Sequence, residues 1–179
     1  MKTELGLRNR QRVRAVDLRV LRRLLRYLLE HHFRHEHIEL GLHLVAKAEM
    51  AEINARFLRH DGSTDVITFD YMDKAPAEAT PALAQREAGP GLHGEIFICL
   101  DDAVTQARQF RTTWPEEMTR YLIHGLLHLH GYDDQSPAAR RVMKRAENRL
   151  LRLVKAQFPL RRLARRPSRR KLRPRNPPW

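Results

Sequence analysis

Residues 113–134, TWPEEMTRYLIHGLLHLHGYDD, contain the signals for a long helix followed by a sharp turn. Thr113 can cap a helix, Pro115 suits its first turn, and two acidic residues follow, which is typical of a helix start. Gly131 is a natural helix stop. The stretch therefore predicts a helix over 113–131, after which the chain can return toward the last turn.

Two histidines lie on one face of this expected helix. His124 and His128 are four residues apart, so that their ring nitrogens can converge on a single ion. The turn at Gly131 allows Asp134 to approach the same point. Two histidines and one carboxylate form a complete catalytic zinc set with a fourth position for water. The same residues also allow an ordinary interpretation, in which both histidines lie on the helix surface or in the core.

The rest of the chain predicts an α+β fold with a mixed sheet of about four strands, packed with helices. Alternating apolar and polar residues, β-branched runs, helical periodicity and capping signals indicate the elements. Strands are expected at 3–10, 37–45, 65–70 and 93–100, and helices at 17–31, 47–59, 101–111, 113–131 and 136–158. Residues 72–91 are rich in proline, alanine and glycine, so they are expected to form a surface loop between strands.

The net charge of +13 is concentrated at the C-terminal end. Between residues 161 and 175 nine side chains are Lys or Arg and none is acidic, so the body of the chain is only mildly basic. Five of the ten prolines follow Phe158, and both charge repulsion and missing backbone donors oppose packed structure there. We therefore expect one domain at 1–158 and a disordered basic tail at 159–179, with RNA as its counterion.

Length and composition exclude several classes of protein. A chain of 179 residues fits one domain of ordinary size. With 42% hydrophobic and 31% charged residues, it has no apolar run approaching the roughly 20 residues that span a bilayer. The first residues lack the pattern of a secretion signal. The single cysteine, Cys99, cannot form an internal disulfide, which suits a cytoplasmic location.

Residues 124–134 resemble the signature HGxLHLxGYDH of the YbeY family of single-strand-specific endoribonucleases, and ten of the eleven positions agree when free positions count as matches. Residues 64–69, TDVITF, are similar to the T(D/N)VLSF strand of that family, and residues 94–96, GEI, to its G(D/E)I strand. Asn54 lies at the family's distance before the first of these strands. The resemblance covers roughly residues 1–155, with the same order and spacing of motifs.

This resemblance implies a zinc-dependent hydrolase that cleaves single-stranded RNA and acts in ribosomal RNA maturation or ribosome quality control. One Zn²⁺ per chain would be held by His124, His128 and Asp134 on a zincin-like metal-bearing helix. RNA and the ribosome are the implied partners, with no membrane and no DNA specificity. The chemistry would be metal-assisted cleavage of a phosphodiester, with a nearby guanidinium neutralising charge at phosphorus.

The sequence departs from the family pattern at two positions. Asp134 replaces the family's third histidine ligand, which lowers the charge of the site and should make a bound water less acidic. The family's arginine, four residues after its asparagine, corresponds to Leu58. The nearest candidate for its catalytic role is Arg59, which lies about 100° further around a regular helix.

Two other functions remain open at this point. A zinc peptidase also uses two histidines on a helix, but its HExxH glutamate would stand at Gly125, which has no side chain. A non-catalytic RNA- or ribosome-binding factor would hold a structural metal in a closed coordination sphere. Asp133 is the alternative to Asp134 as ligand or base, and His130 is expected to pack or face solvent. The RNA substrate, the physiological ion and the attacking nucleophile are not specified.

Overall fold

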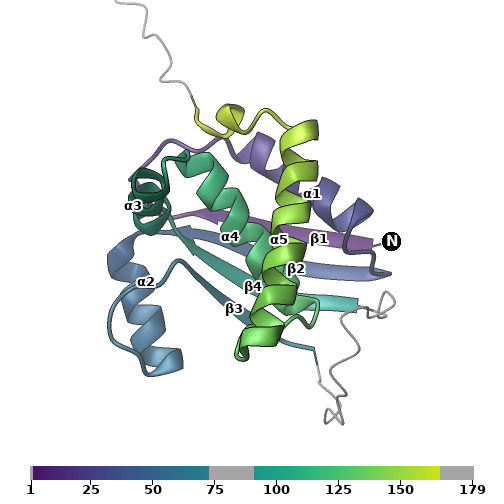
Figure 1. The fold of residues 1–179 in the computed structure, drawn as a ribbon, viewed down its shortest axis with the longest axis horizontal. Coiled ribbons are helices and arrows are strands. Elements are labelled where there is room, and N and C mark those ends of the chain that lie inside the picture. The colour runs from purple at the N-terminus through teal and green to yellow at the C-terminus, as the bar shows by residue number, and fades with distance from the viewer. Residues whose placement is uncertain (1, 73–90, 166–179) are drawn as a thin grey trace, which may run out of the picture.

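The computed structural model describes residues 2–72 and 91–165 as a four-stranded mixed sheet with helices over one face (Figure 1). The strands β1 (Lys2–Asn9), β2 (His37–Val45), β3 (Val66–Asp70) and β4 (Gly91–Cys99) have the order β1-β2-β4-β3. β2 is parallel to β1 and β4, whereas β3 is antiparallel to β4. The expected α+β class with about four strands is confirmed. Most of the expected loop at 72–91 lies outside the described residues.

Five α-helices accompany the sheet. Their bounds are α1 (Leu18–His31), α2 (Lys47–Ile53), α3 (Leu100–Phe110), α4 (Trp114–Leu129) and α5 (Pro137–Gln157). α1, α4 and α5 lie over one face of the sheet, while α2 and α3 follow the ends of β2 and β4 (Figure 1). In the described ranges, no helix combines the length and hydrophobicity that a membrane crossing requires.

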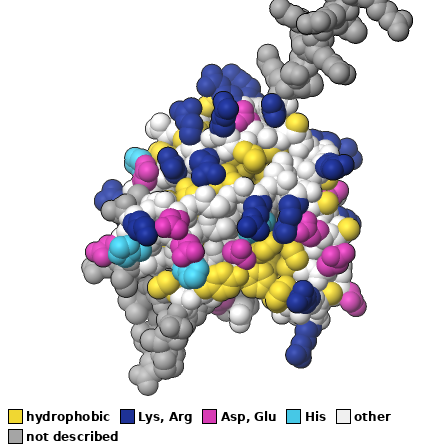
Figure 2. All heavy atoms as spheres, turned by 180° about the vertical axis from the view of Figure 1, so that it is seen from behind, with side chains coloured by type: hydrophobic (Ala, Val, Ile, Leu, Met, Phe, Trp, Pro, Cys, Tyr) yellow, Lys and Arg dark blue, Asp and Glu magenta, His cyan; other side chains and the backbone are white. Residues whose placement is uncertain are grey.

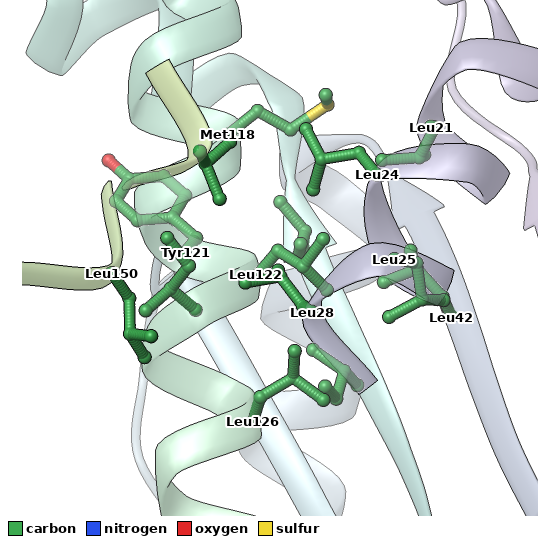
Figure 3. Close-up of a cluster of buried hydrophobic side chains, with 14 of the residues drawn as sticks. Leu21, Leu24, Leu25, Leu28, Leu42, Met118, Tyr121, Leu122, Leu126 and Leu150 are labelled. Atoms are coloured by element: carbon green, nitrogen blue, oxygen red, sulfur yellow. The ribbon is translucent and has the colours of Figure 1, made fainter. Parts of the chain in front are cut away.

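The main core lies between α1, α4, α5 and the sheet. α1 forms because its leucines recur at helical spacing and because the Asp17 carboxylate accepts hydrogen bonds from the Arg19 and Val20 backbone N–H groups. Burial of each such leucine contributes about 1.5–3 kcal/mol. The buried side chains that face one another in this core include Leu21, Leu24, Leu25, Leu28, Leu42, Leu122, Leu126 and Leu150 (Figure 3).

α4 lies very close to the sheet, and Gly125 makes this approach possible. A Cβ atom at Gly125 would lie 2.9 Å from Ile96 Cγ2 and 3.1 Å from Thr68 Cγ2, on β4 and β3. Only a residue without a side chain fits at this point without displacing its neighbours. The contact fixes α4 against the sheet and, with it, the histidines on either side of Gly125.

The structure differs from the sequence expectation at two helices. The helix expected at 47–59 continues after α2 as a π-helical turn, η1 (Asn54–Leu58), and Arg59 then adopts a left-handed conformation with φ 57°. The helix expected at 101–111 begins one residue earlier, at Leu100, so Asp101 lies inside α3 and does not cap it. Its Oδ2 instead accepts a hydrogen bond of 2.8 Å from Lys47 N at the start of α2, because α2 and α3 begin side by side after parallel strands.

The first part of the expected C-terminal tail belongs to the fold. Residues Leu160–Leu163 form a 3₁₀ helix, η2, in which Leu160 and Leu163 are buried in the main core. The expectation that the whole of 159–179 is disordered is therefore wrong for this turn. The free energy gained by burying its two leucines exceeds the cost of holding the two arginines between them close together. Residues 166–179 lie outside the described part of the chain.

Candidate metal centre

α4 places the imidazoles of His124 and His128 one helical turn apart. Their Nε2 atoms are 3.1 Å apart, and Asp134 Oδ2 lies 3.9 Å from His124 Nε2 and 4.0 Å from His128 Nε2. Within the described residues, these three side chains form the only group of potential metal ligands whose donor atoms all lie within 4.8 Å of one another. The structure thus brings together the three ligands expected from the sequence.

The turn after α4 delivers Asp134 to this point. Gly131 has a positive φ of 90°, and the backbone then folds back so that Tyr132 N donates to Leu127 O. Asp133 does not join the cluster, because its Oδ1 accepts a hydrogen bond from Gln135 N and its side chain closes its own turn. Of the two adjacent aspartates, Asp134 is the one that faces the histidines.

The second ring nitrogen of each histidine has an acceptor as its partner. His124 Nδ1 lies 3.4 Å from Glu147 Oε2, and His128 Nδ1 lies 3.2 Å from the carbonyl oxygen of Tyr132. A carboxylate and a carbonyl can only accept, so a hydrogen on each Nδ1 satisfies both partners, and this tautomer of a neutral imidazole has its lone pair on Nε2.

In that tautomer the two Nε2 lone pairs face each other at 3.1 Å, an arrangement that a cation bound between them stabilises. The donor set of two imidazoles and a carboxylate is one that zinc accepts. Orientation of each metal-binding imidazole by a carboxylate or a carbonyl is the usual arrangement around such an ion. The residues present therefore fit a metal ion.

Glu147, on α5, is ionised in this environment. Its side chain is 5% exposed and its Oε1 accepts hydrogen bonds from Arg120 at 2.6 Å and Lys144 at 2.9 Å. Burial alone would raise its pKa, but hydrogen bonds from His124, Arg120 and Lys144 outweigh it and lower the pKa to about 2. Burial, followed by the charge of His124 when it is protonated, lowers the pKa of His128, which favours the neutral imidazole that can act as a ligand.

Two clefts meet at the cluster, and Asp134 lines both. The first, here called the cationic groove, has a volume of about 550 Å³ and lies between α4 and α5. It is lined by four basic side chains, namely Arg120, Arg140, Arg141 and Lys144. The second, here called the aromatic cleft, has a volume of about 490 Å³ and is lined by Phe69, Tyr71 and Tyr132.

The structure leaves Arg59 apart from the three clustered ligands. It follows η1, its side chain is exposed, and it lines neither the cationic groove nor the aromatic cleft. The guanidinium nearest to the cluster in sequence is Arg120, one turn before His124 on α4, and it binds Glu147. Of the two expectations for His130, packing or solvent exposure, the structure shows packing: it lies edge-to-face against Phe33 with ring centroids 5.4 Å apart.

Sequence reasoning missed Glu147 and Arg120. Glu147 carries a signal in the sequence, because it is an acid on the apolar face of α5 that includes Met143, Leu150 and Val154. A charge on a buried helix face needs a partner. Arg120 carries a weaker signal, since it lies four residues before His124 and therefore on the same side of α4.

The chain is similar to known proteins in sequence and in fold. The sequence profile of the YbeY family, described as Endoribonuclease YbeY, matches residues 7–155. The protein named Endoribonuclease YbeY from Bacteroides fragilis is 36% identical over 117 residues, which cover 65% of this chain and 73% of that protein. The protein of the same name from Salinibacter ruber is 35% identical over 133 residues, covering 73% and 81%.

The fold is also similar to the solution structure of TM1509 from Thermotoga maritima. The TM-score is 0.55 at 23% identity, and the match covers 86% of this chain and 90% of that one. At this level of identity the likeness concerns the fold alone.

Proposed function

This chain belongs to the YbeY endoribonuclease family, and on that basis we propose that it is a metal-dependent endoribonuclease that cleaves single-stranded RNA in ribosomal RNA maturation. The observation that carries the proposal is the cluster of His124, His128 and Asp134, in which two imidazole Nε2 atoms lie 3.1 Å apart beside a carboxylate. This cluster opens onto a groove lined by basic side chains. A cation site next to positive charge suits an anionic substrate such as RNA.

His124, His128 and Asp134 would hold one Zn²⁺, with α4 as a zincin-like metal-bearing helix. Their donor atoms are separated by 3.1–4.0 Å. Ligand atoms of a tetrahedral site with bonds of about 2.0–2.2 Å are separated by about 3.3–3.6 Å, so the observed spacing fits such a site after small side-chain movements. When bound, the ion supplies Lewis-acid polarisation of a phosphate oxygen and lowers the pKa of a bound water.

The surrounding residues hold this arrangement in place. Glu147 and the Tyr132 carbonyl fix the two imidazoles in the tautomer and orientation that a cation requires, so that little reorganisation is needed on binding. Asp134 gives the site one more negative charge than a third imidazole would. That charge favours retention of the cation and makes a bound water less acidic than in a site of three histidines.

Arg59 remains our candidate for the catalytic guanidinium, and η1 supports it. Hydrogen bonds in a π-helix join residues five apart instead of four. Asn54–Leu58 is π-helical, so the step of five residues from Asn54 to Arg59 makes about one turn. In an α-helix, a residue four positions after the asparagine would lie one turn away in the same way. The extra residue in the sequence is thereby absorbed. The buried Asn54 side chain donates to Gly62 O at 2.9 Å, which holds the loop that follows Arg59.

Particular observations argue against the two alternative functions, a zinc peptidase and a non-catalytic RNA-binding factor with a structural metal. A peptidase of the HExxH kind needs a glutamate at Gly125, where even a Cβ would lie 2.9 Å from Ile96 Cγ2. A purely structural metal would be enclosed by four ligands. Here the side chains of His124, His128 and Asp134 are 25%, 27% and 40% exposed, and they border two clefts.

We include ribosomal RNA, reached on the ribosome, and a cytoplasmic location in this proposal. The nine basic residues between 161 and 175, with no acid among them, support an RNA partner because such charge is neutralised well by phosphates.

The lone cysteine, Cys99, is buried, and burial raises its pKa to about 12, so it has no role as a nucleophile.

Metal analysis combined with cleavage of single-stranded RNA by the full chain tests this function. The purified protein should hold about one zinc ion and cut a single-stranded RNA, but not the same sequence in a duplex. His128→Ala should lose both the metal and cleavage while keeping a cooperative thermal transition, because the core does not depend on the ion. The exposed His37 provides the matched control, and His37→Ala should behave as the wild type.

Two results would contradict the proposal. Metal-loaded wild-type protein that leaves single-stranded RNA intact would remove the enzymatic function. Loss of the helical circular dichroism on treatment with a chelator would favour the structural-metal alternative.

A further inference from the structure

The two clefts beside the metal centre differ in charge. In the cationic groove, four basic side chains face three carboxylates, those of Asp65, Asp134 and Glu147. Of these acids, Asp134 belongs to the proposed metal site and Glu147 is engaged by His124. The described lining of the aromatic cleft contains no Lys or Arg and includes Asp70, Asp133 and Asp134. A phosphate next to the reacting one would therefore be attracted to the groove and repelled from the aromatic cleft.

Two of the four cations in the groove are not neutralised. Arg120 and Lys144 both bind Glu147 Oε1, at 2.6 and 2.9 Å. Arg140 and Arg141 are exposed, and neither forms an ion pair with a carboxylate in the part of the chain that the structure describes. The positive charge available to a ligand thus comes from these two arginines.

Arg140 is held next to the metal centre. Its Nε donates a hydrogen bond of 3.2 Å to the carbonyl oxygen of Asp134, the residue whose carboxylate faces the two histidines. A guanidinium has five N–H donors, so the four on its terminal nitrogens remain for a ligand. A planar pair of such donors matches the oxygens of a phosphate group.

We propose that Arg140 and Arg141 form a subsite for a backbone phosphodiester of the RNA that flanks the one to be cleaved. This inference rests on the proposed function and adds to it the path that the RNA takes from one cleft across the metal centre to the other. The scissile phosphate lies at Asp134, where the clefts meet, and the flanking phosphate lies over the first two turns of α5. The nucleotide on the other side of the cluster lies against the aromatic cleft.

The position of these arginines is unfavourable for the helix itself. The N-terminal end of a helix carries partial positive charge, so acids are stabilising there and cations are not. α5 has no acid in its first turn and has Arg140 and Arg141 directly after it. The opposite face of the molecule has a different character, because acidic, basic and histidine side chains are interspersed on it (Figure 2). The stability of the helix therefore does not account for two adjacent arginines beside the cluster.

The test compares two double variants of the full, metal-loaded chain. Arg140→Ala with Arg141→Ala removes the proposed subsite. Arg149→Ala with Arg152→Ala removes the same charge from exposed positions further along α5, outside the groove. For a 12-nucleotide single-stranded RNA, the groove variant should lose on the order of tenfold in kcat/KM, since charge-assisted hydrogen bonds to a phosphate are lost. The plot of log kcat/KM against log salt should flatten by about 0.7, the contribution of one phosphate contact.

A second measurement identifies the phosphate. In a series of RNAs, one phosphate at a time near the cleavage site is replaced by a neutral methylphosphonate. At one flanking position this replacement should lower kcat/KM of the wild type and of the Arg149/Arg152 variant by about tenfold. The same replacement should lower kcat/KM of the groove variant only slightly further. The arginines and the phosphate contact each other, so removing the second partner after the first has little additional effect.

Folding and metal binding are checked separately. All variants should keep the zinc content of the wild type. Arg141→Glu should keep or raise the melting temperature, because an acid near the helix N-terminus is favourable, and yet lower kcat/KM. A loss of activity with unchanged melting temperature and zinc content does not come from unfolding.

The outcomes separate this inference from the function on which it rests. Equal kcat/KM and salt dependence for the groove variant and its control, in a wild type that cuts RNA, would overturn the subsite and leave the function intact. Additive losses at every methylphosphonate position would also overturn it. A metal-loaded wild type that does not cut RNA at all would remove the proposed function, and the subsite with it.

Discussion

Glu147 connects the metal centre to α5 through a single buried carboxylate. It faces His124 Nδ1 with one oxygen and accepts hydrogen bonds from Arg120 and Lys144 with the other. A buried charge without such partners would be costly, and here three groups compensate it. The same carboxylate that holds α4 and α5 together therefore also orients a proposed metal ligand. A substitution of Glu147 should therefore change both the affinity for the metal and the stability of the fold, and different experiments measure the two effects.

Glu147→Gln should weaken zinc binding by about tenfold or more, because an amide keeps the volume of the side chain but lacks the charge that makes the His124 imidazole a stronger donor. Competition with a chromophoric chelator measures this affinity. Glu116→Gln is the matched control, because Glu116 binds Lys155 at 2.8 Å and does not contact the histidines. Equal zinc affinities for the two variants would contradict the orienting role of Glu147.

The stability of the protein should fall in acid through the same residue. The pKa of Glu147 is lowered from 4.5 to about 2. The ionised form therefore stabilises the folded state fully above about pH 4.5, and this contribution is lost as the pH falls toward 2, by on the order of 3 kcal/mol at most. Urea unfolding at several pH values, in wild type and Glu147→Gln, should show the difference between them closing over this window. A constant difference from pH 6 to pH 2 would argue against the assignment.

At the level of elements, the packing of α4 on the sheet places the histidines. Gly125 lies between them and against β3 and β4, and the helix has no room there for a Cβ atom. α4 itself is specified locally, by its early proline and the glycine that ends it, whereas Thr113 occupies the N-cap position without a side-chain hydrogen bond. Its position relative to the sheet depends on a contact with Ile96 and Thr68, which belong to other strands.

Gly125→Ala should destabilise the protein by about 1–3 kcal/mol. The strain of fitting a methyl group 2.9 Å from Ile96 Cγ2 exceeds the gain of about 1 kcal/mol in helix propensity. Thermal and urea unfolding measure the change. Gly6→Ala is the control, because a Cβ atom at Gly6 meets nothing within 4 Å, and it should leave stability nearly unchanged. If both variants were equally stable, the close approach of α4 would not limit the fold.

The π-helical turn η1 supports a prediction for Arg59. If its guanidinium stabilises charge at phosphorus, Arg59→Ala should lower kcat by about 10²–10³-fold, as expected when a donor to a developing charge is lost. Zinc content should not change, because Arg59 is not among the clustered ligands. Arg56→Ala, which removes an exposed arginine from the same turn, is the control and should keep kcat. Equal kcat values for both variants would remove Arg59 from the mechanism.

On the scale of the whole molecule, the C-terminal segment joins the core before its basic residues continue. Asp17 N donates to Leu163 O at 2.8 Å, and Arg165 N donates to Ala15 O at 2.9 Å, so η2 is attached to the segment that leads into α1. Leu160 and Leu163 fill the core at this point. The chain therefore contributes to folding up to Arg165, whereas six of the nine basic residues between 161 and 175 come later in the sequence.

Two truncations separate these contributions. A chain that ends at Arg165 should keep its stability and kcat but bind RNA less well at low salt, with the salt slope flatter by about 2 if three phosphate contacts are lost. A chain that ends at Phe158 should in addition lose about 2–5 kcal/mol, because Leu160 and Leu163 leave the core. Thermal unfolding and salt titrations of RNA binding measure both effects. An unchanged salt slope in the first truncation would exclude the basic segment as an RNA contact.

The local sequence was sufficient for most of the helices and strands and for the candidate metal ligands His124 and His128, whereas the choice of Asp134 over Asp133 came from the family resemblance. α1 and α4 follow from apolar spacing and end signals, and the order of strands and helices follows from the same kind of pattern. One helical turn relates His124 to His128, and the turn at Gly131 returns the chain so that an aspartate can approach them. These relations extend over about ten residues, so neighbouring side chains along the chain determine them.

The tertiary structure decided what surrounds those ligands. Glu147 follows His124 by more than twenty residues, and the two meet only because α5 packs across α4. The burial of η2, the use of Asp101 to cap α2 and the difference in charge between the two clefts likewise depend on segments far apart in the sequence. A residue pattern encodes which face of an element is apolar, but not which distant element covers it. That choice is made by the packing of the whole core, because burial free energy depends on the total apolar area removed from water.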